Sequence, residues 1–100
     1  MYASIRRYAG DVALADRLAE HEDEVRALIS GIPGFRAYYL VRGDDATTSI
    51  TICDDRAGAE QSNKVAAGWL RENLSDVTVA PPQVTAGDIV IHGMAASSKA

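Results

Sequence analysis

The sequence has little of what marks a metal-binding, disulfide-bonded or membrane protein. It contains one cysteine, Cys53, which cannot form an intramolecular disulfide, and two histidines, His21 and His92, which lie far apart. The net charge is -4 with acidic and basic residues interspersed, so no basic surface for nucleic acid is indicated. No apolar run approaches the roughly 18 residues of a membrane-spanning helix. We therefore expect a cytoplasmic protein without a metal, another cofactor, a nucleic-acid partner or a membrane anchor.

Six segments of regular structure are predicted in the 100 residues. Runs rich in β-branched and aromatic residues predict strands, and apolar residues at spacings of three, four and seven predict helices. The predicted elements are a strand at 2–8, a helix at 12–30, strands at 35–42 and 47–53, a helix at 56–74 and a strand at 84–92. We expect one domain over residues 1–92 and a loose C-terminal tail over residues 93–100.

Local signals set the ends of the two predicted helices. Asp11 is the expected N-cap of the first helix. This helix should end at Gly31, because glycine can adopt a left-handed conformation there and Pro33 cannot continue the helical hydrogen bonding. Asp54 and Asp55 supply the cap of the second helix. The order β-α-β-β-α-β is that of a ferredoxin-like α+β fold, which predicts an antiparallel sheet with both helices on one face.

Alternation of side chains along the strands divides the sheet into two faces. The more apolar face is predicted to pack against the helices and carries Ala3, Ile5, Phe35, Ala37, Tyr39, Val41, Thr48, Ile50, Ile52, Ile89 and Ile91. The other face carries Ser4, Arg6, Tyr8, Arg36, Tyr38, Leu40, Ser49, Thr51, Asp88, Val90 and His92. Leu18 and Trp69 are the expected helical partners of Ile50, Ile52 and Ile89 in the core.

The polar face has no predicted helix to cover it. A domain of this size exposes a large share of its surface, so we predict that a second copy packs against this face. The resulting homodimer would enclose a ligand pocket between the two sheets.

Five segments carry a resemblance to known proteins. They are residues 2–8 (YASIRRY), 33–39 (PGFRAYY), 55–63 (DRAGAEQSN), 69–74 (WLRENL) and 84–88 (VTAGD). With these segments the chain resembles the dimeric α/β-barrel superfamily, especially small proteins of the antibiotic biosynthesis monooxygenase-like group. The resemblance extends over nearly the whole chain and implies the same two-subunit barrel.

The resemblance also implies a type of site. Monooxygenases of this group hold an acidic phenolic substrate between tyrosine, tryptophan, asparagine, arginine and histidine side chains, without metal or flavin. Asn63 and Trp69 on the second predicted helix, together with His92, are the candidate catalytic residues that this pattern suggests. The histidine that several relatives carry toward the end of this helix is missing, because no histidine lies between His21 and His92. Its absence argues against a haem-degrading role, which would need an axial imidazole.

The candidate ligand-binding residues are Arg6, Tyr8, Tyr38 and Thr51, all on the polar face. A guanidinium in a dry pocket stabilises oxyanion charge, and phenol hydroxyls orient a ligand. The alternative is that Arg6 and Arg36 pair with carboxylates such as Asp88 across the dimer interface, which the tyrosines would anchor.

Two further candidates also have a second interpretation. His92 has the chemistry of a general base but ends the last predicted strand beside the loose tail. Trp69 could form part of a substrate site, although its helical spacing with Ala66 and Leu70 favours a place in the core.

Two hypotheses of function follow. The first is a homodimeric barrel that binds a small aromatic or phenolic molecule and acts as a cofactor-independent monooxygenase, in which a bound phenolate or enolate reacts directly with dioxygen. The second is a non-catalytic homodimeric module for structure or interaction, whose sheet face is filled by the partner. The sequence leaves open whether the protein is an enzyme. A pocket of roughly a few hundred cubic ångströms would favour the first hypothesis.

Overall fold

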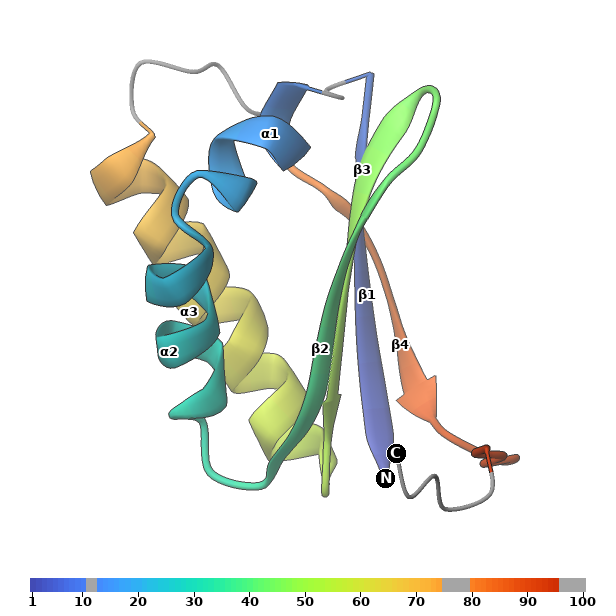
Figure 1. Ribbon diagram of the computed structural model, residues 1–100. Helices are drawn as coiled ribbons and strands as arrows, with labels where there is room; N and C mark the ends of the chain where they lie inside the picture. Colours follow the sequence, from blue (N-terminus) through green and yellow to red (C-terminus); the bar gives the residue numbers. More distant parts are fainter. Residues whose placement is uncertain (11–12, 75–79, 96–100) are drawn as a thin grey trace.

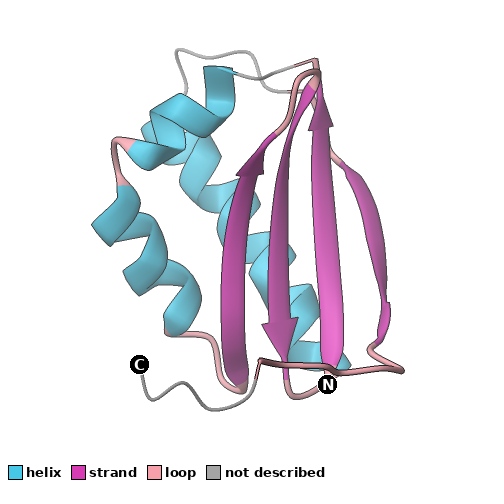
Figure 2. Ribbon diagram, turned by 45° about the vertical axis from the view of Figure 1, so that its right-hand side comes forward, coloured by secondary structure: helices cyan, strands magenta, loops and turns pink. Residues whose placement is uncertain are grey.

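The computed structural model describes residues 1–10, 13–74 and 80–95. The elements are β1 (Tyr2–Ala9), α1 (Ala13–Ala19), α2 (Glu22–Ser30), β2 (Phe35–Arg42), β3 (Ala46–Cys53), α3 (Arg56–Asn73) and β4 (Gln83–Asp88). Within these residues the strands form one antiparallel sheet in the order β2-β3-β1-β4. The helices cover one face of the sheet and leave the other free (Figures 1 and 2). The predicted ferredoxin-like α+β fold is confirmed.

The predicted helix over residues 12–30 forms two consecutive helices, α1 and α2. The chain tightens between them, because the amide of His21 donates to the carbonyl oxygen of Leu18, three residues back, at 3.0 Å. This break lets α1 turn toward the sheet while α2 runs beside α3 (Figure 1). Neither glycine nor proline marks it in the sequence. The predicted start of the helix at residues 11 and 12 lies outside the described residues.

The ends of α2 and α3 follow local signals. Helix α2 ends at Ser30 as predicted, but Gly31 keeps a right-handed backbone with φ of -76°, and the left-handed residue is Gly34 with φ of +82°. Asp55 caps α3 as predicted, accepting a hydrogen bond from the amide of Gly58 at 3.1 Å.

Gly58 fixes how closely α3 approaches the sheet. A Cβ atom at this position would lie 3.0 Å from both the Cβ of Cys53 and the carbonyl oxygen of Pro33, so a side chain here would force the backbone apart. The first turn of α3 is therefore held directly against the end of β3. The following turns bring Ser62 and Asn63 into hydrogen-bonding reach of β1.

Most strand residues predicted to share a face do so, but the helices cover the opposite face from the one predicted. Ile5 pairs with Ile50, and Ile50 pairs with Tyr39, so these apolar residues do share a face. That face is the helix-free one, on which Tyr39 is 57% exposed. The strand residues that lie buried beneath the helices are Ser4, Arg6, Tyr8, Thr47, Ser49, Thr51 and Cys53.

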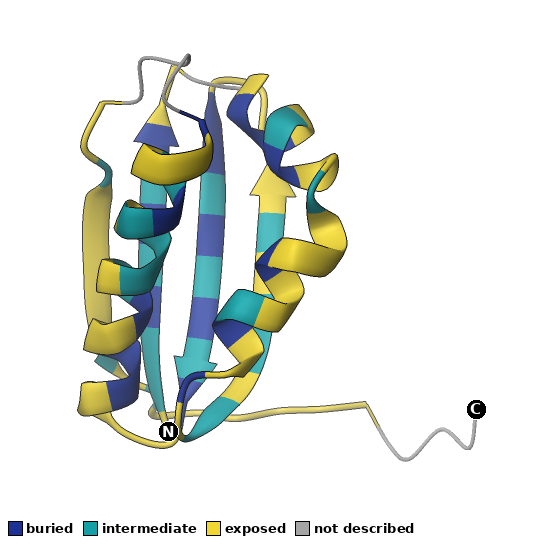
Figure 3. Ribbon diagram, turned by 90° about the vertical axis from the view of Figure 1, so that its left-hand side faces the viewer, coloured by how far each residue is buried: buried dark blue, intermediate teal, exposed yellow. Residues whose placement is uncertain are grey.

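Figure 3 shows the resulting alternation of buried and half-buried residues along the central strands. Ile50 and Ile52, predicted to lie in the core, are therefore only half-buried. Phe35 is an exception to the predicted alternation, because an irregularity in the β2–β3 register between Phe35 and Ala37 lets it pack against the core.

The apolar core is supplied mainly by the helices and the chain next to them. Its buried members from these segments are Leu14, Leu18, Val25, Ile29, Ile32, Trp69 and Leu74. The predicted burial of Leu18 and Trp69 is confirmed. Each fully buried leucine contributes roughly 1.5–3 kcal/mol through removal of its side chain from water. The helices thus bring enough apolar surface to cover a sheet face that is itself polar.

The last strand is shorter than predicted and ends at Asp88 instead of residue 92. Asp88 pairs with Tyr2, the first residue of β1, so no further partner is available in the sheet. Ile89 makes one more backbone bond, from its amide to the carbonyl oxygen of Met1 at 2.9 Å. Ile91 is exposed and Ile89 is only half-buried, so the expected burial of these two residues in the core is wrong. Across the described ranges, none of the helices combines the length and apolar content that a membrane span requires.

Candidate functional site

Arg6 extends from the middle of β1 into the space beneath α3 and is only 2% exposed. Its Nη1 donates to Oδ1 of Asn63 at 2.8 Å and to Oγ of Ser62 at 3.2 Å, and its Nη2 donates to Oγ1 of Thr51 at 3.4 Å. Its Nε has no hydrogen-bond partner, and within the described residues no carboxylate pairs with the guanidinium. Because arginine keeps its charge in proteins, this interior holds an uncompensated cation.

The amide of Asn63 is oriented by two donors from β1. Its Oδ1 accepts from Oγ of Ser4 and from Nη1 of Arg6, each at 2.8 Å. Ser62 is fixed in turn, because its Oγ donates to the carbonyl oxygen of Ala59 at 2.6 Å. The amide nitrogen of Asn63 makes no hydrogen bond within the described part of the chain. It is therefore free to donate to a ligand.

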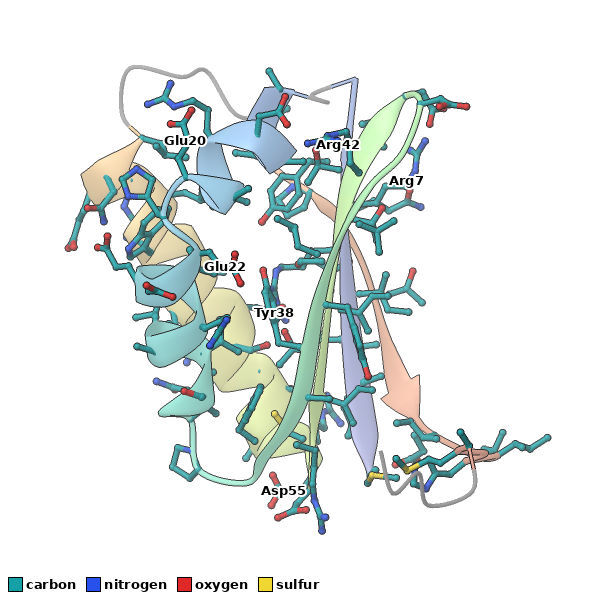
Figure 4. The ribbon with its side chains drawn as sticks, in the orientation of Figure 1. Arg7, Glu20, Glu22, Tyr38, Arg42 and Asp55 are labelled. Atoms are coloured by element: carbon teal, nitrogen blue, oxygen red, sulfur yellow. The ribbon has the colours of Figure 1, made fainter. Side chains whose placement is uncertain are left out.

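Two tyrosines lie near Arg6. Tyr8 follows it on the same face of β1, and Tyr38 of β2 is the cross-strand partner of Thr51. Figure 4 shows Tyr38 pointing between the sheet and the helices, whereas Arg7 points to the opposite side. Burial raises the pKa of both tyrosine hydroxyls above the ordinary value of 10.0, and the charge of Arg6 opposes this rise. Both phenols are therefore neutral near pH 7 and can donate hydrogen bonds.

A cavity of about 520 Å³ opens beside this cluster. Its lining residues are Arg6, Tyr8, Asn63, Ala67, Leu70, Arg71, Leu74, Ala80, Pro81, Pro82 and Val84. A smaller void of about 30 Å³ shares Arg6 and Tyr8 with the cavity and is also lined by Tyr38, Ser49 and Trp69. The lining of the large cavity is mostly apolar, and in the part of the chain that the structure describes it contains two guanidinium groups and no carboxylate or imidazole.

Most of the residues predicted to bind a ligand or to act in catalysis lie close together in the structure, and one lies apart. Arg6, Tyr8, Tyr38, Thr51, Asn63 and Trp69 all lie in the layer between the sheet and the helices. His92 lies exposed beyond β4 and does not line the cavity.

Trp69 has structural contacts as well as a place on the wall of the small void. Its Nε1 donates to Oε2 of Glu24 at 3.0 Å. Its ring packs edge-to-face with the ring of His21, and the two ring centroids lie 5.4 Å apart. These contacts tie α3 to α2 and agree with the core interpretation of Trp69.

The alternative in which Arg6 pairs across a sheet-to-sheet interface does not fit its position. Arg6 lies beneath the helices, on the covered side of the sheet. Arg36 pairs with Asp54 within the chain, not with Asp88. The pocket expected between two sheets is likewise in another place, because the same side chains face the helices.

Sequence reasoning missed several residues of the site. Ser62 is fully buried, and the helical spacing of Ala59, Ser62, Ala66 and Trp69 would have placed it on the buried side of α3. Ser4 is on the face predicted to carry Arg6, but nothing in the sequence indicated that Asn63 would bond to it.

Within residues 1–10, 13–74 and 80–95, no group of three or more histidine, cysteine, aspartate or glutamate side chains is placed to hold a metal ion.

Comparison with known proteins identifies the fold. No protein-family model matches the sequence, and no curated protein matches it with significance. A monooxygenase from the gene ActVA-Orf6 of Streptomyces coelicolor, solved with nanaomycin D, is similar in structure with a TM-score of 0.64 and 19% identity, over 97% of this chain and 92% of that chain. SnoaB, a cofactor-independent oxygenase from Streptomyces nogalater, has a TM-score of 0.62 and 14% identity, over 91% of this chain and 94% of its own.

A dimeric ferredoxin-like protein from an uncultured marine organism has a TM-score of 0.65 and 12% identity, over 94% of this chain and 97% of that chain. At these identities the likeness establishes the fold alone. The chain shares the ferredoxin-like α+β fold of these solved structures.

Proposed function

We propose that the protein binds a flat, weakly acidic aromatic molecule, a phenol or an enol, and acts on it as a cofactor-independent monooxygenase. The observation that carries the proposal is Arg6, a buried cation with a free Nε and no carboxylate partner, on the wall of a cavity of about 520 Å³. An oxyanion of the ligand beside the guanidinium would neutralise this charge. A cavity of this size fits a small organic ligand, for which sites of about 300–1,000 Å³ are usual.

The shape and chemistry of the cavity favour an aromatic ligand. Its walls away from Arg6 are aliphatic, with Leu70, Leu74, Pro81 and Val84 among them. Such walls favour an apolar body, while the polar groups at the inner end fix the position of one oxygen. The free amide nitrogen of Asn63 and the neutral hydroxyl of Tyr8 are the further donors available there.

The ligand must supply its own anion. The lining residues that the structure describes include no histidine, aspartate or glutamate, so none of them is an ordinary general base. A nearby positive charge favours the ionised form of an acid, and Arg6 would therefore stabilise a phenolate or enolate. The proposed substrate is accordingly one that is acidic in itself.

Such an anion can reduce dioxygen directly. The nucleophilic carbon of the enolate, which still carries a hydrogen, adds to dioxygen, and protonation gives a hydroperoxide. Loss of water then breaks the O–O bond and the remaining C–H bond and leaves a carbonyl group. One oxygen atom enters the product, the other leaves as water, and the substrate supplies all four electrons, two from the enolate and two from the C–H bond. Arg6 and the surrounding donors would stabilise the oxyanion in a water-poor cavity. The shared fold of two solved oxygenases supports this choice of reaction.

We also propose that the protein is a homodimer formed through the helix-free face of the sheet. Ile5, Tyr39, Val41, Ile50 and Ile52 lie on this face, and Val41 is 47% exposed. An apolar sheet face of this kind is typical of an interface with a second copy. The dimeric ferredoxin-like protein of similar structure supports the proposal. In such a dimer each cavity belongs to one subunit and lies outside the sheet-to-sheet contact.

The test of the ligand proposal is Arg6→Met, which removes the charge and keeps much of the side-chain volume. Calorimetric titration with 2-naphthol and a panel of phenols and quinones should show at least about tenfold weaker binding to this variant than to wild type. Oxygen uptake is then followed with each ligand that binds. Arg36→Met, at an arginine paired with Asp54 on the surface, is the matched control and should bind as wild type does.

Folding of the variant is checked by urea unfolding. Arg6→Met should still unfold in one cooperative transition, because the loss of its hydrogen bonds to Ser62, Asn63 and Thr51 is partly offset by removal of a buried charge that has no ionic partner. Equal binding by Arg6→Met and wild type would assign Arg6 a structural role. Failure of every ligand to bind would favour the non-catalytic module.

A further inference from the structure

The arginines of this protein divide into two groups by their partners. The sequence has eight arginines. Six of them form ion pairs with carboxylates of the same chain: Arg7 with Asp45, Arg17 with Glu20, Arg26 with Glu22, Arg36 with Asp54, Arg42 with Asp16 and Arg56 with Glu60. Within the described residues, Arg6 and Arg71 pair with none. These two line the same cavity.

The charge of the cavity is opposite to that of the protein. The chain has a net charge of -4, yet the described residues that line the cavity include two guanidinium groups and, among these eleven, no carboxylate. A concave site lined by one sign of charge concentrates ligands of the other sign. Both charges are therefore available to a ligand.

The two arginines occupy different depths. Arg6 is buried on β1, whereas Arg71 is exposed in the last turn of α3. The helix dipole favours a cation in a last turn, which accounts for a positive residue at Arg71. It does not account for the lack of an ion pair with any described carboxylate, when every other surface arginine has one. The aliphatic side chains of Leu70, Leu74 and Pro82 also line the cavity.

We propose that the cavity selects a ligand with two acidic groups on a flat apolar body. The first is the phenolate or enolate oxygen at Arg6, and the second is a carboxylate at Arg71 on the rim. This inference rests on the proposed function and names its substrate class, an aromatic hydroxy acid. The carboxylate at the rim would fix which end of the ring system enters first. Arg71 is thus a specificity-determining residue.

The experiment compares two ligands that differ only in the second acidic group. They are 2-naphthol and 6-hydroxy-2-naphthoic acid, in which the carboxylate lies at the end of the ring system opposite the hydroxyl. Calorimetry near neutral pH should show wild type binding the hydroxy acid about five- to tenfold more tightly, as expected for one partly exposed charge-assisted contact. In Arg71→Gln this preference should disappear, while the affinity for 2-naphthol changes less than about twofold.

The control is Arg56→Gln, which removes the same charge from the opposite end of α3, where Arg56 pairs with Glu60. It should keep the wild-type preference. If wild type does not prefer the hydroxy acid, or Arg71→Gln keeps the preference, the second subsite is wrong, and 2-naphthol binding would still uphold the proposed function. If neither ligand binds to wild type, both the proposed function and the second subsite are wrong.

Discussion

The helix-covered face of the sheet is polar and buried, whereas the helix-free face is apolar and partly exposed. Arg6 and Thr51 on the covered face bond to each other, and Arg6 also bonds to α3. On the other face Ile5, Ile50 and Tyr39 lie side by side in register across three strands. The two faces are formed by alternate residues of the same strands.

The difference shows that burial within one chain does not follow the polarity of a strand alone. The helices supply most of the apolar core, so the covered strand face can carry hydrogen-bonding groups, provided that they are nearly all satisfied. The exceptions within the described residues are Nε of Arg6 and Oγ of Ser49, which are cross-strand neighbours. The covered face therefore suits recognition of a polar ligand group, and the free face suits association.

The largest effect is expected on the free face. Ile50→Asp should weaken the dimer at least about a thousandfold, because two-fold symmetry buries two carboxylates and removes two isoleucines from one interface. Sedimentation equilibrium at micromolar concentration measures the association. Ile91→Asp, at an exposed residue beyond β4, is the control and should leave it unchanged. A wild-type monomer, or an Ile50→Asp variant that dimerises normally, would contradict the proposed interface.

A smaller effect is expected where the helices supply the core. Leu14 of α1 is fully buried, so Leu14→Ala should lower the free energy of unfolding by about 2–5 kcal/mol through lost burial and the remaining cavity. Urea unfolding measures this loss. Ala13→Gly, at the exposed start of the same helix, controls for helix propensity and should cost no more than about 1 kcal/mol. A loss below about 0.5 kcal/mol for Leu14→Ala would mean that α1 does not contribute to the core.

The smallest effect concerns the buried phenols of the covered face. Burial raises the pKa of Tyr8 and Tyr38 in the folded protein, so the unfolded chain loses these protons first as the pH increases. The stability that these hydroxyls contribute is present below pH 10 and is lost as the pH rises through their folded pKa values. The free energy of unfolding should therefore fall above about pH 10.

Urea unfolding between neutral pH and the alkaline range tests this dependence. Tyr8→Phe and Tyr38→Phe should each reduce the alkaline fall, and the double variant should reduce it further. A double variant that loses stability as steeply as wild type would show that other groups cause the fall.

The sequence was sufficient for the fold because its signals are local. The Asp55 cap, the turn after Arg42 and the apolar spacing in α3 each specify an element, and their order specifies the topology. Which strand residues share a face also followed from alternation, except at Phe35. The side of the sheet that the helices cover did not, because alternation is symmetric with respect to the two faces. Here both faces carry large side chains, so polarity pointed to the wrong one.

The candidate site could be predicted in its members but not in its place. Arg6, Tyr8, Tyr38 and Thr51 share a face by alternation alone, which is why they were found together. The contact of Arg6 with Asn63 depends on the position of α3 along the sheet, which Gly58 fixes through a close approach that no spacing rule describes. The break before α2 was likewise missed, because it contains no residue that disfavours a helix.

Ile5 and Arg6 are adjacent on β1 but face opposite sides of the sheet. A single-residue insertion or deletion early in this strand would exchange their sides and disturb both surfaces at once. Substitutions without a shift of register act on one side only. The ligand range of such a protein can thus diverge during evolution while its subunit contact stays constant, and an engineer can vary alternate positions of β1 to change one property and keep the other.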